Sequence, residues 1–245
     1  MQCGRRAAGP ERSGGDGVSV INDAVVWLND PLNWSNPGGI EERLTEHLEI
    51  SVAAVLLGCV VAWPVGILLG RRGAASGVIV LLSNLTQAVP VIALLTILSL
   101  TPIGLGKTAV IIALAVFSLP ALLANAYTGM REVDPEVRDA AKGVGMTTVQ
   151  QLLRVELPLA VPFLATGLRI ATTTVVATAT LATAVNGGGL GMIISAGFGL
   201  GPGHGGQILA GAVLVAGLAL IIDGVMALIE RKLTPKVLRR AAGRS

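Results

Sequence analysis

Residues 50–70 read ISVAAVLLGCVVAWPVGILLG, a run of 21 residues without a charged side chain. An α-helix needs ~20 apolar residues, each rising ~1.5 Å, to cross the hydrocarbon core of a bilayer. Strands of a membrane β-barrel alternate polar and apolar residues over only ~10 positions, so this run predicts a helix. Three further regions are equally poor in charge, the last holding only Arg169 and Asp223: Gly73–Gly106, Thr108–Met130 and Leu157–Ile229.

The composition of the 245 residues agrees with a membrane protein. Apolar residues make up 52% of the chain and charged residues 13%, against roughly 25% charge in soluble domains. The mean hydropathy of +0.73 excludes a disordered chain. Aromatic residues are only 3%, and the basic residues do not cluster with them, so we expect no nucleic-acid partner. Two cysteines form neither a disulfide framework nor a metal-ligand cluster, and Cys59 is expected to be a small packing residue.

The charge-poor regions divide into five expected spans, so the predicted fold class is an all-α polytopic membrane protein. The expected helices are 48–70, 76–100, 107–128, 159–185 and 207–229. The last two are separated by residues 186–206, which contain ten glycines and Pro202 and therefore predict a loop with a short helix at Met192–Ala196. This loop is either a pliable segment near a gate or docking surface, or a plain turn. Its candidate gate residues are Gly187, Gly188, Gly189 and Gly191.

Lysine and arginine predict the orientation of the spans. With alternating sides, twelve basic residues fall on one side and five on the other, and the richer side is expected to be cytoplasmic. The N-terminus is then outside and the C-terminus inside. We expect an extracytoplasmic, partly disordered arm over 1–43, a membrane domain over 44–230 and a basic cytoplasmic tail over 231–245. Within the arm, Val20–Leu28 is either an interfacial amphipathic helix or loosely ordered chain.

The loop of about 30 residues at 129–158 carries unusually complete helix-capping signals. Asp134-Pro135-Glu136 predicts a helix start, and Gly143 and Gly145 predict its end. Thr147 and Gln150 have the spacing of a capping box, and the helix that follows them is expected to stop at Leu157-Pro158. Although a simple connector is the alternative, so much capping favours a shaped helix–glycine–helix surface.

The same loop resembles the EAA loop of binding-protein-dependent ABC importer permeases. Asp139-Ala140-Ala141, then Gly145, then Val155-x-Leu157-Pro158 keeps every spacing of that pattern, with Asp for Glu and Val for Ile. The resemblance implies the type I, MetI-like permease core and a coupling loop, here 131–158, that sits in a cleft of a cytoplasmic ATPase. The coupling residues it implies are Asp139, Ala140, Ala141, Gly145, Leu157 and Pro158.

A wider set of motifs resembles the osmoprotectant permeases, which import glycine betaine, choline, carnitine or proline betaine. The motifs include Glu46-His47-Leu48, Ile103-Gly-Leu-Gly-Lys107, Tyr127-Thr-Gly129, Val155-Glu156-Leu157-Pro158, Gly167-Leu-Arg169 and Gly188-Gly-Leu-Gly191. A permease for amino acids, methionine or another small solute is the alternative.

The resemblance also implies the chain's partners and location. Expected partners are an extracytoplasmic solute-binding protein, an ABC ATPase that binds the ATP, and a second permease subunit, identical or different. The chain itself is expected to be a multi-pass plasma-membrane protein and not an enzyme, with no catalytic residue, metal or cofactor.

Arg169 and Asp223 are the only charges expected inside the spans, at similar depth. Because charges in a bilayer are costly and are usually paired, one hypothesis is that the two form an ion pair. The alternative is that Arg169 extends toward the cytoplasmic interface while Asp223 faces water. His47 and His204 are expected to be structural.

Overall fold

The computed structural model describes residues 17–73, 77 and 89–233, and all regular structure in these ranges is helical. The described elements are α1 (Gly17–Asn29), α2 (Leu32–Ser35), α3 (Ile40–Arg72), α5 (Val91–Ser99), α6 (Lys107–Arg131), α7 (Pro135–Gly143), α8 (Thr148–Gln151), a π-helix η1 (Leu152–Glu156), α9 (Leu157–Thr178), a 3₁₀-helix η2 (Ala179–Val185), α10 (Gly191–Leu200) and α11 (Gly205–Leu233). Most of the second expected span, 76–100, lies outside the described residues, and α5 is its final part.

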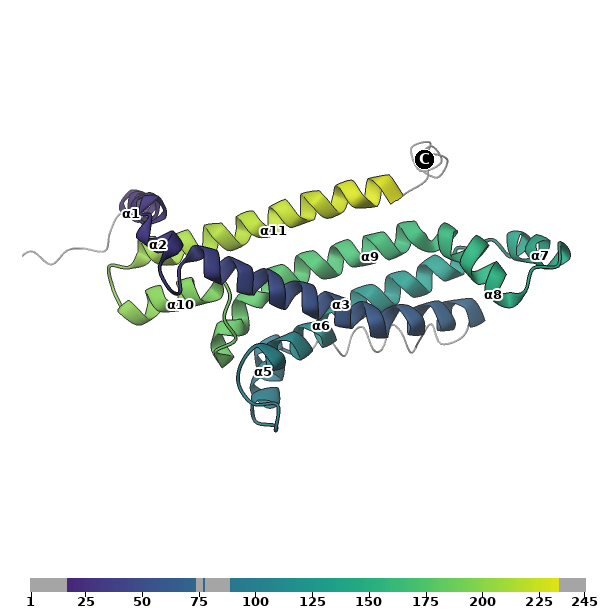
Figure 1. Cartoon of the computed structure of the whole chain (residues 1–245), viewed down its shortest axis with the longest axis horizontal. Coiled ribbons are helices and arrows are strands. Elements are labelled where there is room, and N and C mark those ends of the chain that lie inside the picture. Colours follow the sequence, from purple (N-terminus) through teal and green to yellow (C-terminus); the bar gives the residue numbers. More distant parts are fainter. Residues whose placement is uncertain (1–16, 74–76, 78–88, 234–245) are drawn as a thin grey trace, which may run out of the picture.

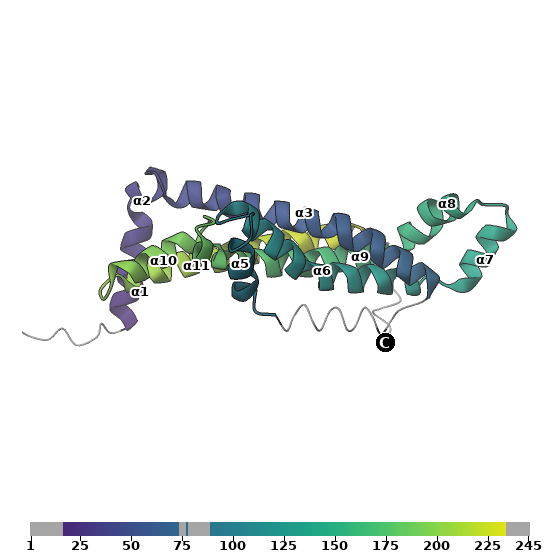
Figure 2. The same ribbon diagram turned by 90° about the horizontal axis from the view of Figure 1, so that it is seen from below.

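The long helices α3, α6, α9 and α11 lie side by side along the longest axis of the molecule (Figure 1). Helices α7 and α8 project from one end of this bundle, and α1, α2 and α10 lie at the other, as the perpendicular view also shows (Figure 2). Among the described residues, four helical segments are long and apolar enough to cross a membrane, and they contain these four helices. Four of the five predicted spans are therefore confirmed by length and composition.

Helix α3 starts at Ile40, eight residues before the predicted start at 48. Its first turn holds Glu41 and Glu42 and its last turn Arg71 and Arg72, charges that stabilise the two ends of the helix dipole. The prediction followed apolar content and therefore missed the polar first turns. As a result α3 runs across the expected boundary between residues 43 and 44.

Small residues let the long helices approach closely. On α3, a Cβ at Gly66 would come within 2.7 Å of the Ala126 side chain, and one at Gly70 within 2.6 Å of the Tyr127 carbonyl oxygen, both on α6. On α9, a Cβ at Gly167 would meet Asn125 at 2.6 Å. Close backbone packing of this kind is typical of membrane helices.

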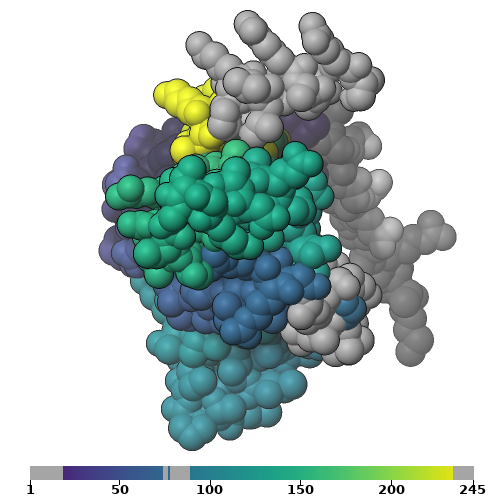
Figure 3. Space-filling model, turned by 90° about the vertical axis from the view of Figure 1, so that its right-hand side faces the viewer, coloured from purple at the N-terminus to yellow at the C-terminus, as the bar shows by residue number. Residues whose placement is uncertain are grey.

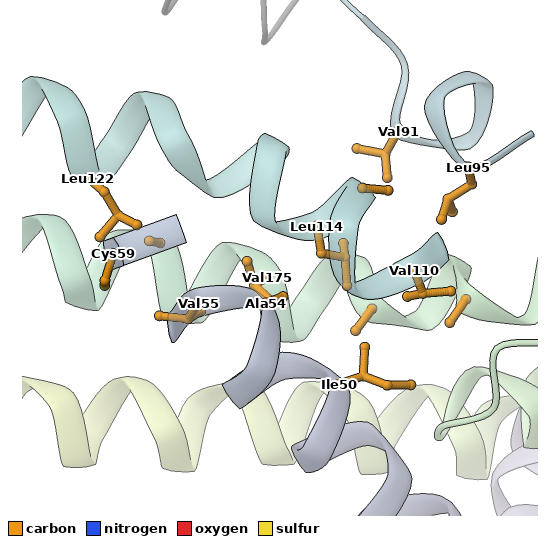
Figure 4. Close-up of a cluster of buried hydrophobic side chains, with 14 of the residues drawn as sticks. Ile50, Ala54, Val55, Cys59, Val91, Leu95, Val110, Leu114, Leu122 and Val175 are labelled. Atoms are coloured by element: carbon orange, nitrogen blue, oxygen red, sulfur yellow. The ribbon is translucent and has the colours of Figure 1, made fainter. Parts of the chain in front are cut away.

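The main core lies where α3, α5, α6 and α9 meet (Figure 4). Ile50 and Ala54 of α3 pack there with Leu114 of α6 and Val175 of α9, all of them buried. Cys59 is also buried in this cluster, which confirms its predicted packing role.

The expectation that a helix ends at Leu157-Pro158 is wrong. Helix α8 continues through the π-helix η1 directly into α9, and the Leu157 amide donates to the Leu152 carbonyl five residues back. Proline cannot donate the usual α-helical bond. A widened π-turn immediately before Pro158 makes room for its ring, so the chain stays helical from the projecting end into the bundle.

Two further expectations concern helices at the end of the bundle opposite α7 and α8 (Figure 1). Residues 17–29 form helix α1, so the helical alternative for this stretch is confirmed, and α1 packs against α11. Helix α10 spans Gly191–Leu200, longer than the short helix predicted at 192–196. Residues 1–16 and 234–245, which hold most of the expected disordered segment and basic tail, lie outside the described residues.

Candidate functional site

Helices α7 and α8, residues 135–151, form a capped hairpin, which we call the α7–α8 hairpin. The Asp134 carboxylate accepts from the Glu136 amide at 2.8 Å, with Pro135 at the first helical position. Thr147 and Gln150 form both bonds of a capping box, at 2.9 and 3.3 Å. The predicted caps are therefore confirmed. Figure 3 looks onto this end of the molecule, where the hairpin forms the foremost surface.

The implied coupling residues lie in two places. Asp139, Ala140 and Gly145 are exposed on the hairpin, Asp139 pairing with Lys142 at 3.0 Å, while Ala141 is buried. Leu157 and Pro158 lie instead in the first turn of α9, at the base of the hairpin. Gly145 has a φ of +80°, a left-handed conformation that glycine adopts without strain.

The hairpin also exposes apolar side chains. Val144 is 76% exposed at the turn, and Val137, Val149 and Leu153 are exposed beside it. Apolar groups projecting beyond the helical bundle, among polar neighbours, are typical of a protein–protein contact surface.

At the base of the hairpin, Glu156 is completely buried between two arginines. Its carboxylate lies 3.0 Å from Arg71 Nε at the end of α3 and 3.9 Å from Arg138 Nε on α7. Arg71 also donates to the Thr148 carbonyl at 3.2 Å, and Arg138 donates to the Met130 carbonyl of α6. We call Glu156, Arg71 and Arg138 the inner clamp. It joins the hairpin to the ends of two long helices.

The sequence did not indicate the inner clamp. From the sequence, Glu156 is only the expected last residue of a helix, and its partner Arg71 is 85 residues away. The sequence offers only a weak signal for this site, which is the position of one carboxylate directly before Leu157-Pro158 and next to an apolar stretch.

Between α9 and α11, on a partly exposed side of the bundle, Arg169 and Asp223 form the ion pair that was one of two alternatives. Arg169 Nε and Nη2 each donate to an Asp223 oxygen at 2.8 Å, and Nη1 donates to Glu230 at 3.2 Å. Thr166 donates to Glu230 at 2.5 Å, and the Thr173 hydroxyl lies 3.3 Å from Asp223. We call these five residues the membrane cluster. Sequence reasoning missed Glu230 because it stands just beyond the last apolar run.

At the opposite end, Glu46 and His47 of α3 hold the glycine-rich turn. Glu46 accepts from the Gly189 amide at 2.9 Å. Buried His47 accepts from the Leu190 amide through Nδ1 at 3.3 Å, and its Nε2 donates to the Val176 carbonyl of α9 at 2.9 Å. This pattern requires a neutral imidazole. We call Glu46 and His47 the outer latch. It fits the structural role expected for His47.

The candidate gate glycines lie in this turn, and all four are buried. A Cβ at Gly187 would meet Val110 at 2.5 Å, one at Gly188 would meet the Glu46 carboxylate at 2.5 Å, and one at Gly191 would meet the Thr180 carbonyl oxygen at 2.0 Å. The turn is therefore closely packed against α3, α6 and η2. His204 is exposed in the following loop, and no cluster of metal-ligating side chains occurs among the described residues.

Long apolar helices that pack closely, with a capped hairpin projecting from one end, define a polytopic helical membrane protein. Residues 54–235 match the family described as the binding-protein-dependent transport system inner membrane component, and the chain belongs to this family. It is thus a multi-pass plasma-membrane protein and a permease of the binding-protein-dependent importers.

Curated relatives cover most of the chain. The choline transport system permease protein OpuBB of Bacillus subtilis is 40% identical over 206 residues, covering 84% of this chain and 94% of the relative. The glycine betaine/carnitine/choline transport system permease protein OpuCB of the same organism is 40% identical over 205 residues, covering 84% and 93%. The carnitine transport permease protein OpuCB of Listeria monocytogenes is 37% identical, covering 80% and 88%.

Solved structures share the fold. The inward-facing MetNI methionine ABC transporter aligns with a TM-score of 0.69 and 24% identity, covering 80% of this chain and 96% of the matched chain. An amino acid ABC transporter crystallised with histidines aligns with a TM-score of 0.62 and 16% identity, covering 90% and 100%. The predicted all-α, MetI-like fold class is confirmed.

Proposed function

We propose that this chain is the permease subunit of an ABC importer for osmoprotectants such as glycine betaine, choline, carnitine or proline betaine. The observation that carries the proposal is the 40% identity, over 84% of the chain, to permeases named for choline and for glycine betaine, carnitine and choline. The two structural neighbours described above, named for methionine and for an amino acid transporter, are 24% and 16% identical and support the fold alone.

In the proposed orientation the N-terminus is outside and the α7–α8 hairpin is in the cytoplasm. A separate ATPase grips the hairpin around Asp139, Ala140, Ala141 and Gly145, and binds all the ATP. The capped, exposed hairpin supports this role. An extracytoplasmic binding protein delivers the solute, and a second permease subunit completes the path.

The inner clamp gives the hairpin a mechanical connection to the bundle. Continuous helix from α8 through η1 into α9, with Leu157 and Pro158 at the junction, transmits movement along one rod. The contact of Glu156 with Arg71 transmits it to α3, and Arg138, which pairs with Glu156 and donates to the Met130 carbonyl, transmits it to α6. Closure of the ATPases would then shift the long helices between inward-open and outward-open states.

In this proposal, the packed turn containing Gly187, Gly188, Gly189 and Gly191 corresponds, at the outer end of the bundle, to the hairpin at the inner end. Its hydrogen bonds to Glu46 and His47 connect it to α3, so a movement of α3 would carry it along. We assign it to the outer gate or docking surface. The proposed chain is a transport subunit and not an enzyme, and its mechanism calls for no metal or cofactor of its own.

The test is ATP hydrolysis by the complex reconstituted in vesicles from this chain, its ATPase and its binding protein. Choline, glycine betaine and carnitine are compared with methionine and histidine. We expect stimulation by at least one of the first three and by neither amino acid. Stimulation by the amino acids alone would establish the alternative substrate class, and the absence of any co-purifying ATPase would contradict the coupling role.

A further inference from the structure

The pair of helices α9 and α11 has two unlike sides. One side carries an apolar hollow of about 170 Å³, lined by Leu48, Val52 and Leu56 of α3, Leu168 of α9 and Ile222 and Met226 of α11. The other carries a hollow of about 340 Å³, which we call the polar hollow, lined by Ile170 and by six polar residues: Thr166, Arg169, Thr173 and Thr174 of α9 and Asp223 and Glu230 of α11. The membrane cluster is thus part of the wall of a cavity.

Helical spacing explains why these groups share one side. Thr166, Arg169 and Thr173 are separated by three and four residues, which places them on one face of α9. Asp223 and Glu230 are seven residues apart, two turns of α11, and therefore also share a face. The two faces meet through the Arg169–Asp223 and Arg169–Glu230 ion pairs.

The polar hollow is not suited to contact with lipid. The side chains of Arg169 and Asp223 each remain 35% exposed although they lie within the apolar helices. A charged side chain at the centre of a spanning helix costs about 2.5–3.5 kcal/mol on insertion scales, so such groups face water or protein. The apolar hollow on the other side of the pair is suited to lipid.

The hollowed surface on this side continues across a third helix, with a mostly apolar lining. A hollow of about 320 Å³ between α6 and α9 shares Ile170 and Thr174 with the polar hollow and reaches Ser118 and Phe117 of α6. One hollowed face therefore runs over α6, α9 and α11.

We propose that the polar hollow is a contact site for the trimethylammonium group of the transported solute. This inference rests on the proposed function, because choline, glycine betaine and carnitine share that cation. Asp223 and Glu230 present carboxylates to the hollow, and Arg169 holds both in place at 2.8 and 3.2 Å. The residues lining it include no aromatic ring that could form a tight cage for the cation.

Weak binding suits this position. A site along a transport path must attract its solute enough to admit it and release it readily. Carboxylates already paired with a guanidinium attract a cation less strongly than free ones do, and the solute-binding protein remains the place for tight capture.

The test uses a thiol reagent that itself carries the cation, trimethylammonium-ethyl methanethiosulfonate. Thr173→Cys is introduced in a background with Cys3→Ser and Cys59→Ala, and the assembled complex is labelled in membrane vesicles. Val52→Cys is the matched control, because Val52 is 56% exposed on the apolar hollow of the same bundle. Only a thiol in water ionises and reacts readily, so we expect labelling of Thr173→Cys at least about tenfold faster than of Val52→Cys.

Excess choline or glycine betaine should slow the labelling of Thr173→Cys, and excess methionine should not. Equal labelling rates at the two positions would overturn the inference, and so would protection by methionine alone. Asp223→Asn should lower choline uptake about tenfold and Asp223→Glu should restore it, with thermal unfolding measured on both variants. The wild-type complex separates the two claims: if it does not transport these solutes the proposed function fails, whereas transport without labelling of Thr173→Cys refutes this site alone.

Discussion

The inner clamp and the outer latch fix the two ends of the same bundle by different chemistry. At the inner end, the buried Glu156 carboxylate lies between two long arginine side chains from different segments. At the outer end, His47 and Glu46 bond directly to backbone groups of a turn whose glycines leave no free space. Long arginine side chains can follow a moving helix, whereas the direct hydrogen bonds between the turn backbone and Glu46 and His47 hold the turn against α3. We therefore expect the contacts of the inner clamp to adjust during movement, whereas the outer turn moves with α3 as one rigid unit.

The largest expected effect is at the inner clamp. Glu156→Gln leaves Arg71 and Arg138 without their buried carboxylate, and breaking a buried ion pair typically costs about 3–5 kcal/mol. We expect that loss in the unfolding free energy of the purified protein, with partial recovery in Glu156→Asp. Glu132→Gln, an exposed acid at the end of α6, should change it by no more than about 0.5 kcal/mol. Equal effects of the two glutamine variants would contradict the clamp.

The outer latch should come next. His47→Ala leaves the Leu190 amide and the Val176 carbonyl without partners, and each buried group left unpaired costs about 1–3 kcal/mol. We expect a loss of about 3 kcal/mol in unfolding free energy, measured as for the clamp. His204→Ala, at an exposed position, serves as the control. If His47→Ala unfolds like wild type, the outer end is not held by this residue.

The close packing of the glycine-rich turn can be tested by adding one methyl group. Gly191→Ala places a Cβ 2.0 Å from the Thr180 carbonyl oxygen, and overpacking of this kind costs about 1–3 kcal/mol. Gly199→Ala in the same helix meets nothing within 4 Å and should stabilise by about 0.5–1 kcal/mol. Thermal unfolding of the two variants should therefore shift in opposite directions. A shift in the same direction would show that the turn is not rigid.

The smallest effect on stability is expected at the hairpin turn. Gly145→Ala forces a left-handed conformation with a cost of about 1–2 kcal/mol, which is confined to the exposed hairpin. We expect little change in global unfolding but less ATPase recovered with the purified permease. Gly143→Ala, which ends the same helix without a positive φ, should leave ATPase recovery unchanged. If the amount of ATPase recovered with Gly145→Ala is normal, the conformation of this turn is not needed for the contact with the ATPase.

Local signals made much of this structure predictable. The caps at Asp134 and Thr147 depend on residues two or three positions apart, and the long apolar runs predicted the spans. The depth of Arg169 and Asp223 followed from the rise of a helix, which is why their pairing could be proposed.

Long-range contacts were not predictable in the same way. The bonds of His47 reach residues 129 and 143 positions away, and Glu156 pairs across 85. Only the packing of α3 against α6 and α9 brings these groups together. The π-turn before Pro158 also escaped prediction. The sequence rule that a helix ends before a proline considers neighbouring residues alone, whereas here a wider turn accommodates the proline within a continuous helix.

The central claim is that the α7–α8 hairpin faces the cytoplasm and is covered by an ATPase. The most direct measurement labels Val144→Cys, in the background lacking Cys3 and Cys59, with a membrane-impermeant maleimide. Our account predicts labelling from the cytoplasmic side only, and protection when the ATPase is bound. Labelling from outside, or equal labelling with and without the ATPase, would contradict it.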